Sequence, residues 1–477
     1  SGICELQRLA HDLNIHYQPY RVKPERSRLE MDVPVIREAS KCIKCMRCIQ
    51  VCDKIQSLSI WDVAGTGSRT TIDVSNNRVI KDSDCALCGQ CITHCPTGGL
   101  RERDDTMEVF SALADPDKIT VVQVAPAVRT AWGEAFGLPR EQATMERMAA
   151  ALRRLGFDYV FDTDFTADLT IMEEGSEFLH RLKSGGLTRY PMFTSCCPGW
   201  VRFLKGQYPQ LTGQLSTAKS PQQMFGSLTK SWLAQKLGVE PEKIFCVSIM
   251  PCVAKKAECE LPTMATEHGP DVDWVLTTRE FVRMLRADQL DPKYLPEEPL
   301  DSPMGVATGA GVIFGATGGV MEAALRSASF LLTGQNPDPE AFSQLREGPD
   351  LREATYDLAG TSVRCAVVSG LGNTRKLLDR ILAGKIHYDF VEVMACPGGC
   401  VGGGGQPIDK EDRELGGIRG DRLHQLDGQA PLRFSHENPQ VQALYREFLG
   451  KPLSEISEYL LHSDHTAWAM PNQRETE

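Results

Sequence analysis

The sequence lacks any uninterrupted apolar segment long enough to span a bilayer, so no membrane span is expected. Its start has neither the apolar core of a secretory signal nor a twin-arginine signal, so we expect a cytoplasmic protein. Positive charge is not in excess, because 52 Lys and Arg residues stand against 63 Asp and Glu, for a net charge of -11. This balance argues against a nucleic-acid partner.

The usual phosphate-binding signatures are also missing. Two glycine-rich stretches, residues 311–319 and 402–405, have neither the Lys-Ser/Thr of a P-loop nor the spacing of a dinucleotide fingerprint. We therefore expect these glycines to allow close backbone packing around a cofactor.

Cysteine, in contrast, is abundant, with 17 residues in a chain of 477. The length is too great for one simple core and suggests about three domains. A disulfide framework is not expected in so long a chain without an export signal, so metal ligation is the better use of the cysteines.

Eight of the cysteines form a duplicated Cys-x2-Cys-x2-Cys-x3-Cys pattern, which matches the bacterial ferredoxin spacing. In such pairs the fourth cysteine of each run binds the other cluster. The spacing therefore predicts one 4Fe-4S cubane on Cys42, Cys45, Cys48 and Cys95, and a second on Cys85, Cys88, Cys91 and Cys52. Zinc is the alternative, although structural zinc sites usually separate two cysteine pairs by a dozen or more residues.

Three more cysteine loops each follow a short apolar run that is typical of a strand. The runs are residues 190–193, 244–250 and 390–395, and the loops contain Cys196 and Cys197, then Cys252, then Cys396 and Cys400. Ligands collect outside the carboxyl ends of strands in open α/β sheets, so the loops could form one pocket with five thiols.

A 4Fe-4S cluster takes four thiolates, which leaves one thiol spare. Adjacent residues of an extended chain point to opposite sides, so we expect only one of Cys196 and Cys197 to bind the cluster. Buried free cysteines are the alternative, since cysteine is among the most buried residue types.

A helix is predicted between a capping box, Thr170-x-x-Glu173, and a stop at Gly185-Gly186. Helical periodicity places Ile171, Phe178 and Leu182 on its apolar stripe and Glu173, His180 and Lys183 on the far side. Glu174, Glu177 and Arg181 fall at the border, where partly buried charges need partners. The residues alone favour a structural ion-pair network here.

The remaining pattern favours α/β layers. Strands are predicted at residues 118–124 and 159–161 with a helix at 141–155 between them, and the alternation continues to the end of the chain. Residues 101–117 are strongly charged and indicate a linker with a helical stretch at 107–113. We expect an N-terminal arm at 1–37, with a helix at 5–13 and a proline-punctuated segment at 19–34, then domains at 38–115 and 116–477.

The peptides TSCCPGW at 194–200, MPCVAKKAE at 250–258 and MACPGGCVGGGGQP at 394–407 resemble the three signature loops of the catalytic subunit of iron-only (FeFe) hydrogenases. The resemblance runs from about Lys41 to near the C-terminus. It implies an α/β catalytic domain, the H-cluster domain, with two small β-sheets flanked by helices. A ferredoxin-like α+β domain with two 4Fe-4S clusters would precede it. The implied reaction is the reversible reduction of protons to H2.

The resemblance also implies roles for single residues. Cys197, Cys252, Cys396 and Cys400 would hold the cubane of the H-cluster, with Cys400 bridging to a diiron subsite that has CO, CN and dithiolate ligands. Cys196 resembles the proton-shuttling thiol. The positions that match the proton channel of the family are Glu174, Ser216, Glu177, Arg181 and Glu258.

Other positions match the walls and donors of the cofactor pocket. Lys255 would donate to a cyanide ligand, and a buried anion does require such a charge-assisted donor. Gln222 would approach the diiron site, and Lys256 is expected to be a surface lysine. The implied walls are Pro126, Met250, Phe314 and Met394, together with Ala127 where many relatives have serine, so one hydrogen bond to a cyanide is expected to be missing.

The expected partners are ferredoxin or a flavin/NAD-linked redox subunit, besides the maturation proteins of the diiron subsite. Residues 2–10 resemble the end of an additional iron-sulfur motif and Ser1 is not a methionine, so we expect upstream residues and assign Cys4 no metal. Two other functions stay open: a non-catalytic iron-sulfur assembly relative and a hydrogen-sensing relative. Retention of Cys196, Glu174, Glu177 and Lys255 argues against the first, and no signalling domain is evident for the second.

Overall fold

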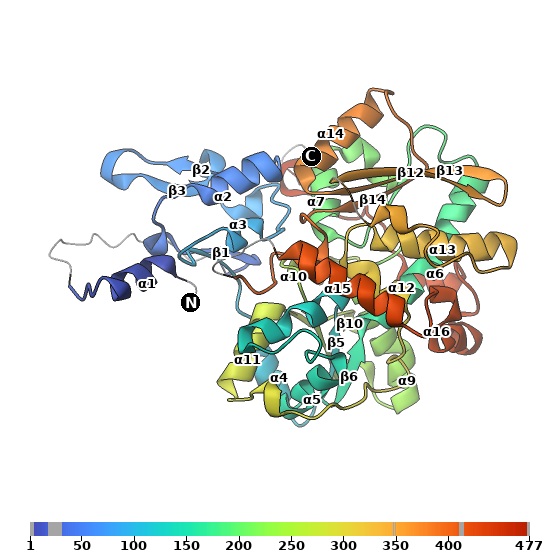
Figure 1. The fold of residues 1–477 in the computed structure, drawn as a ribbon, viewed down its shortest axis with the longest axis horizontal. Coiled ribbons are helices and arrows are strands. Elements are labelled where there is room, and N and C mark those ends of the chain that lie inside the picture. The colour runs from blue at the N-terminus through green and yellow to red at the C-terminus, as the bar shows by residue number, and fades with distance from the viewer. Residues whose placement is uncertain (1–3, 18–30, 347, 349, 410–414, 475–477) are drawn as a thin grey trace.

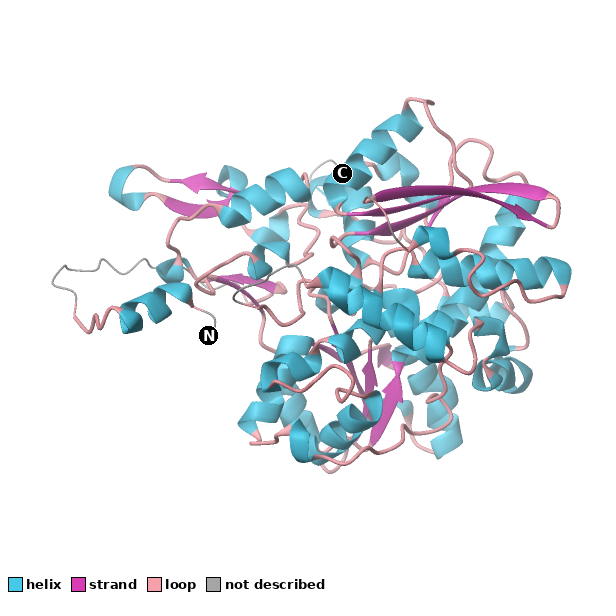
Figure 2. Ribbon diagram, viewed as in Figure 1, coloured by secondary structure: helices cyan, strands magenta, loops and turns pink. Residues whose placement is uncertain are grey.

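The computed structural model describes residues 4–17, 31–346, 348, 350–409 and 415–474. Among these, two four-stranded sheets with flanking helices make up the larger part of the molecule, and a smaller part with two-stranded sheets lies beside them (Figures 1 and 2). Two small sheets flanked by helices are the architecture that the sequence predicts for the catalytic part.

The strands in chain order are β1 Val35–Arg37, β2 Trp61–Ala64, β3 Thr71–Val74, β4 Leu100–Glu102, β5 Ile119–Val124, β6 Tyr159–Asp162, β7 Met192–Phe193, β8 Ile244–Met250, β9 Ala265–Thr266, β10 Gly269–Pro270, β11 Trp274–Thr277, β12 Leu351–Leu358, β13 Thr361–Ser369 and β14 Phe390–Met394. The helices are α1 Glu5–Asp12, α2 Arg47–Gln50, α3 Gln90–Thr93, α4 Thr106–Leu113, α5 Met145–Leu155, α6 Thr163–Lys183, α7 Pro198–Gln207, α8 Pro221–Leu228, α9 Ala234–Leu237, α10 Ala254–Glu258, α11 Thr278–Ala287, α12 Gly309–Val312, α13 Gly319–Thr333, α14 Leu371–Leu382, α15 Gly416–Gln429, α16 Pro439–Leu444, α17 Glu455–Leu461 and α18 Pro471–Arg474.

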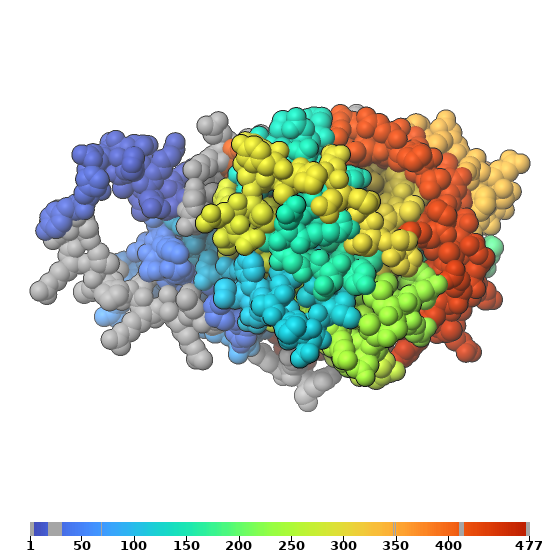
Figure 3. All heavy atoms as spheres, turned by 90° about the horizontal axis from the view of Figure 1, so that it is seen from below, coloured from blue at the N-terminus to red at the C-terminus, as the bar shows by residue number. Residues whose placement is uncertain are grey.

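The first sheet has the order β11-β8-β5-β6, and all of its strands are parallel. Its two central strands are mostly apolar and buried, as expected for strands covered on both faces, and their buried polar residues Gln123 and Ser248 hydrogen-bond each other at 2.8 Å. Val122 pairs with Val247, and both side chains are fully buried in the larger hydrophobic core. In Figure 3, seen from below, the residues around this sheet form one continuous surface in cyan, green and yellow.

The second sheet has the order β12-β13-β14-β7, with β12 antiparallel and the other three strands parallel. β7 is only two residues long, shorter than the run at 190–193 that predicts it. β7 and β14 run side by side, so their carboxyl ends deliver two of the cysteine loops to one place. The third loop comes from β8 of the first sheet.

The long helix α6 differs from the prediction at its N-terminal end. It begins at Thr163, where the Asp162 side chain accepts from the backbone N–H of Asp164, so the capping box at Thr170 is wrong. Thr170 lies inside the helix and its hydroxyl donates to the carbonyl of Thr166. Glu173 is fully buried and not on a solvent-facing side, because Tyr445 donates to its carboxylate. The predicted stop is confirmed, since Gly185 has φ of 75°.

The smaller part of the molecule contains the duplicated cysteine pattern. Its strand β1 pairs antiparallel with β4, and β2 pairs antiparallel with β3 (Figure 1). β4 overlaps the start of the stretch predicted as a linker. Glu102 is buried instead of solvated there, because its carboxylate accepts a charge-assisted hydrogen bond from Arg279. The proline-punctuated segment at 19–34 lies largely outside the described residues. Within the described part of the chain, no helix is long and apolar enough to cross a membrane.

Candidate functional site

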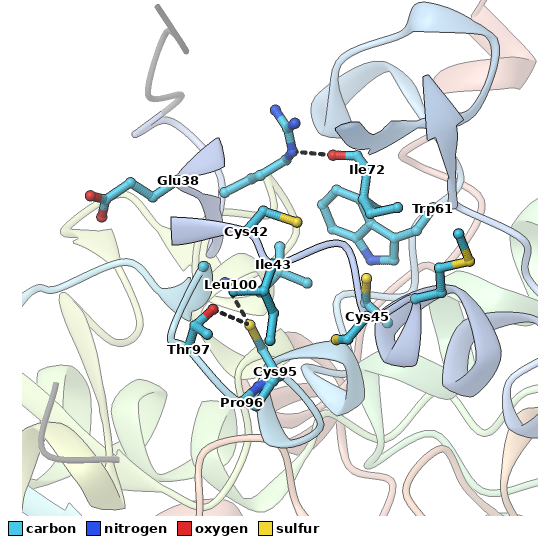
Figure 4. Close-up of a pocket in the computed structure, with 14 residues that line it drawn as sticks. Glu38, Cys42, Ile43, Cys45, Trp61, Ile72, Cys95, Pro96, Thr97 and Leu100 are labelled. Atoms are coloured by element: carbon cyan, nitrogen blue, oxygen red, sulfur yellow. Dashed lines mark hydrogen bonds between the residues drawn. The ribbon is translucent and has the colours of Figure 1, made fainter. Parts of the chain in front are cut away.

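The first group of four cysteines, Cys42, Cys45, Cys48 and Cys95, lines one small cavity of about 30 Å³ (Figure 4). Burial, assisted by the neighbouring thiols of the other three, raises the pKa of the Cys48 thiol to about 12. Cys45 is exposed, so this group lies at the surface of the molecule. The cavity brings together the four cysteines that the spacing assigns to one cubane.

The second group is more deeply buried. Burial raises the pKa of Cys52 to about 12, with further increases from Cys85 and Cys48. Burial also raises the pKa of Cys91, again with contributions from Cys85 and Cys52. The pKa of Cys88 is raised by burial and by the thiols of Cys396, Cys91 and Cys85. These thiols are therefore mutual neighbours, and Cys52 lies with the second run, as the fourth-cysteine rule predicts.

Local backbone conformation explains why the two runs form similar thiol groups. Lys44 and Met46 have φ of 59° and 61°, and the matching positions Leu87 and Gly89 have φ of 54° and 74°. These left-handed residues turn the chain so that backbone N–H groups point at sulfur: Lys44 donates to Cys42 and Leu87 to Cys85, each at 3.4 Å. The repeated pattern therefore folds the same way twice.

In the described ranges, no three His, Cys, Asp or Glu side chains come close enough to hold a single metal ion. Thiolates around a cubane stand farther apart than thiolates around one ion, because the irons of the cluster lie between them. Four thiols around a cavity, as in the first group, suit a cubane better than a single metal ion.

A third pocket of about 60 Å³ lies where the ends of β7, β8 and β14 meet. Cys196, Cys197, Cys252 and Cys400 line it, and all four are half-buried. Cys396 lies beside them. Burial raises the pKa of its thiol, and the nearby thiols of Cys252 and Cys197 contribute in the same direction. The three loops therefore meet in one place, as the strand-end rule predicts, although their strands belong to two different sheets.

The walls of this pocket are the apolar residues that the sequence singles out. Met250 and Met394 end β8 and β14, and Phe314 comes from the glycine-rich stretch. The complete apolar wall among the predicted positions is Pro126, Ala127, Met250, Phe314 and Met394. Sequence reasoning missed Thr163 and Ala167 on α6, which line the same pocket without a motif to mark them.

Lys255 and Gln222 bring polar groups to the pocket. The Lys255 ammonium donates to the carbonyl of Cys196 at 3.0 Å and to the Glu258 carboxylate at 2.9 Å. Ser220 and Gln222 also donate to Glu258, at 3.0 and 3.2 Å. Glu258 therefore orients the cation and Gln222 in the pocket, and its hydrogen bonds do not join it to Arg181. The Oε1 atom of Gln222 is buried without a hydrogen-bond partner in the described structure.

Glu174 lies deep in the protein, on the α6 face near Cys196. Its side chain is 1% exposed, and neither carboxylate oxygen has a hydrogen-bond partner that meets ordinary geometry among the described residues. Burial, assisted by the charge of Glu177, raises its pKa to about 8, against smaller lowering effects of the Ser216 hydroxyl and the Ser195 N–H. Glu174 also raises the pKa of Cys196, after the larger effect of burial. Such a carboxyl can hold a proton near neutral pH.

Glu177, Ser216 and Arg181 form one hydrogen-bonded chain. The Ser216 hydroxyl donates to Glu177 at 2.7 Å, and Arg181 donates to the other oxygen of Glu177 at 2.6 Å. The Arg181 side chain is 20% exposed, whereas Glu177 and Ser216 are buried. The chain therefore connects the neighbourhood of Glu174 with the surface. Sequence reasoning missed Thr217 and His462, which extend it: the Thr217 N–H donates to Glu177, and its hydroxyl bonds His462 at 2.8 Å.

The structure corrects the prediction for Lys256. This residue is fully buried instead of lying at the surface, because its ammonium donates to Asp105 at 2.6 Å and to Glu280 at 2.9 Å. Asp105 lies just before α4 and Glu280 lies on α11, so the lysine joins two elements. A two-residue charge pattern gives no sign of such partners.

The second cysteine group and the third pocket are in backbone contact. The Cys396 thiol lies 3.9 Å from the carbonyl oxygen of Cys88, and Gln90 donates to the carbonyl of Gly402 at 3.0 Å. A methyl group on Gly404 would collide with the carbonyl oxygen of Cys88. The glycines at 402–405 thus provide close backbone packing, as their sequence predicts.

The donor set fits an iron-sulfur cluster with an attached anionic subsite. Buried thiols with raised pKa values stay protonated unless a cation replaces the proton, which is what metal binding does. The pocket offers thiols, soft methionine and apolar walls, one buried ammonium and an unpartnered amide oxygen. These are the groups that would hold and orient a desolvated metal cofactor.

Comparison with known proteins supports this assignment. Residues 118–404 match the family model of the iron only hydrogenase large subunit, C-terminal domain. Residues 418–468 match that of the iron hydrogenase small subunit, and residues 41–99 that of a 4Fe-4S dicluster domain.

Curated relatives and solved structures agree with the family models. The NADP-reducing hydrogenase subunit HndD of Solidesulfovibrio fructosivorans is 47% identical over 470 residues, 98% of this chain and 80% of the relative. Iron hydrogenase 1 of Clostridium pasteurianum is 38% identical over 89% of this chain and 74% of its own length. A variant of the FeFe-hydrogenase HydA1 from Chlamydomonas reinhardtii superposes with a TM-score of 0.68 at 40% identity, covering 77% of this chain and 99% of that chain.

Proposed function

Since the chain belongs to the iron-only hydrogenase family, and relatives such as HndD and iron hydrogenase 1 are named as hydrogenases, we propose that it catalyses the reversible reduction of protons to H2. The observation that supports this most is the third pocket, where the cysteine loops converge, Lys255 donates to the carbonyl of Cys196, and Glu174 lies close enough to raise the pKa of the Cys196 thiol. In this proposal, residues 116–477 form the catalytic domain, residues 38–115 the ferredoxin-like domain and residues 1–37 an arm.

We assign Cys197, Cys252, Cys396 and Cys400 to the cubane of the H-cluster, with Cys400 also touching the diiron subsite. When bound, that cofactor supplies the redox chemistry at iron. The contribution of the chain is different: it ligates, excludes water and fixes donors. Lys255 offers an ammonium to an anionic ligand, while Glu258 holds it in place. Ala127 has no hydroxyl to add a second donor.

The proton route in this proposal begins at the Cys196 thiol. A thiol can both give and take a proton. Glu174 receives the proton next, since its raised pKa lets the carboxyl hold a proton near neutral pH. Ser216, Glu177 and Arg181 then connect it to the surface through the bonds described above. Glu258 stands apart from this chain and its contacts suit the orientation of Lys255.

Electrons enter through the ferredoxin-like domain in this proposal. The first cysteine group is at the surface and the second is in contact with the catalytic pocket. Electrons would therefore pass from the donor to the first group, then to the second group, and then to the catalytic pocket. HndD is named as a subunit of an NADP-reducing hydrogenase, which favours a partner redox subunit as donor; ferredoxin is the other candidate. The cytoplasmic location and the need for maturation proteins stay predictions.

Relatives named cytosolic iron-sulfur assembly component 3, such as that of Rattus norvegicus, are 31% identical over 402 residues. An infrared spectrum of the anaerobically matured protein distinguishes a hydrogenase from a non-catalytic iron-sulfur assembly protein. We expect carbonyl and cyanide bands together with H2 production from reduced dye. Bands in wild type that vanish in Cys400→Ala would support the assignment, whereas a wild-type protein with full iron and no such bands would contradict it.

The electron route has its own test, made on the full chain. Cys45→Ala should lose about four iron atoms of ferredoxin-type ligation and most turnover with a protein donor, while its infrared bands remain. The control is Cys4→Ala, because Cys4 caps α1 through its sulfur and is assigned no cluster. Equal turnover of Cys45→Ala and wild type with the protein donor would refute the route.

A further inference from the structure

The segment that contains Ser216 is held from two sides. On one side it continues the second sheet: the Ser216 N–H donates to the carbonyl of Phe193 at the end of β7, at 2.8 Å. On the other side it pairs with a segment from the C-terminal region, residues 461–465. The Lys219 N–H donates to the carbonyl of Leu461 and the Ser463 N–H to the carbonyl of Thr217, both at 2.7 Å. Ser216 therefore lies between a strand of the core and this C-terminal segment.

His465, at the end of that segment, bonds Ser216 directly. The His465 Nε2 atom lies 2.8 Å from the Ser216 carbonyl oxygen. A carbonyl only accepts, so the hydrogen must be on Nε2. The side chain is buried, and Lys205 donates to the carbonyls of both His465 and Trp468, which fixes the chain on either side.

The charges that face His465 keep it from acting as a second acid. Burial lowers its pKa, and the Lys205 ammonium lowers it further. The hydrogen bond to the Ser216 carbonyl raises this pKa, by less than burial lowers it but by more than Lys205 does, and Glu177 and Asp464 raise it with smaller effects. A neutral imidazole with its proton on Nε2 is a fixed donor at neutral pH, and its function is to hold an orientation.

The orientation of Ser216 matters because its hydroxyl makes two contacts at once. It donates to Glu177 at 2.7 Å and accepts from the Ala218 N–H at 3.2 Å. Glu174 lies near enough for the same hydroxyl to lower its pKa. A rotation of the Ser216 peptide would move the hydroxyl away from one of these two carboxyl groups.

We propose that His465 is a positioning residue that holds the Ser216 hydroxyl between Glu174 and Glu177 through the Ser216 carbonyl. His465 thereby supports the proton route from the C-terminal segment, although it touches neither the cofactor pocket nor the reacting atoms. This inference rests on the proposed function.

The test compares three variants of the full, matured chain. His465→Leu removes the donor with a side chain of similar volume, which matters because His465 also borders a cavity of about 20 Å³. His465→Gln keeps an N–H at the place of Nε2. Ser463→Ala is the matched control on the same segment, since the Ser463 hydroxyl has no hydrogen-bond partner in the described structure.

We expect His465→Leu to keep the infrared bands and lower H2 production by about tenfold, with a larger solvent deuterium isotope effect and a changed pH profile. This loss is smaller than the about hundredfold or more expected when a proton carrier is removed. His465→Gln and Ser463→Ala should stay near wild type in all of these measurements.

Three outcomes would overturn the proposal. One is unchanged turnover per loaded site in His465→Leu, with only a lower melting temperature, which would indicate a purely structural role. The second is an unchanged isotope effect, and the third is a loss in His465→Gln as large as in His465→Leu. If matured wild-type protein itself made no H2, the proposed function would fail first and independently.

Discussion

Replacement of Glu174 by glutamine should make the protein more stable and less active. Glu174 is 1% exposed, and among the described residues neither of its carboxylate oxygens has a hydrogen-bond partner with ordinary geometry. Its ionised form is therefore costly in the folded state. Glutamine has nearly the same shape and cannot ionise, so it removes that cost together with the exchangeable proton.

The size of the stability gain follows from the pKa. Burial, assisted by Glu177, raises the pKa of Glu174 from 4.5 to about 8 in the folded protein. Between these values the unfolded chain has lost the proton while the folded protein keeps it, so the free energy of unfolding falls as pH rises. Each unit is about 1.4 kcal/mol, which gives a penalty of about 3 kcal/mol at pH 7 and about 4 kcal/mol at pH 8, where the folded protein begins to lose the proton as well. Below pH 4.5 both states are protonated and the penalty disappears.

The measurement is the apparent Tm of wild type and Glu174→Gln at a fixed scan rate, at several pH values between 4.5 and 8. We expect the two proteins to coincide near pH 4.5 and the variant to melt a few degrees higher at pH 8. Hydrogen production by the same samples should fall by about a hundredfold or more, since a proton carrier is lost.

The exposed Glu108 on α4 provides the control. Glu108→Gln should change stability by less than about 0.5 kcal/mol at every pH. A Tm difference for Glu174→Gln that is absent at pH 8, or that has the same size at pH 4.5 and pH 8, would show that this carboxyl is not held protonated by burial.

Four further changes have defined outcomes. Cys196→Ala should keep the infrared bands and lose most turnover, whereas Cys197→Ala should prevent assembly of the cluster; a Cys196→Ala protein with near-normal turnover would refute these roles. Glu177→Gln should behave like Cys196→Ala in both measurements, since it removes a titrating group with little change of shape, and full activity would exclude it from the route. Lys256→Ala should lower the free energy of unfolding by about 3–5 kcal/mol, because it leaves two buried carboxylates without their cation, and a Tm within one degree of wild type would contradict the buried pairing.

The sequence predicts the cysteine loops well because their pattern is local. Spacing alone indicates the two ferredoxin-type groups, and apolar runs before Cys197, Cys252 and Cys396 place these residues at strand ends. Spacing does not indicate that the strands belong to two sheets, since β7 and β8 have the same local character. That fact depends on long-range pairing, which no window of residues contains.

Buried charge is where sequence reasoning fails. Periodicity treats Glu173 as a surface residue, but Tyr445 and His462, far along the chain, supply its partners. Lys256 is misplaced for the same reason. The Thr170-x-x-Glu173 pattern satisfies the capping rule in isolation, yet an earlier cap at Asp162 starts the helix and buries the pattern inside it. Polar residues with distant partners imitate surface residues in any local analysis.

The packing of Gly404 against Cys88 has a consequence for kinetics. Backbone meets backbone at this point, so the second cysteine group packs directly against the loop that carries Cys396 and Cys400. Internal transfer between clusters would then proceed without a domain swing, and viscogens such as sucrose should leave it untouched. Only the encounter between an external donor and the first cysteine group, at the exposed Cys45, should slow as the solvent viscosity rises.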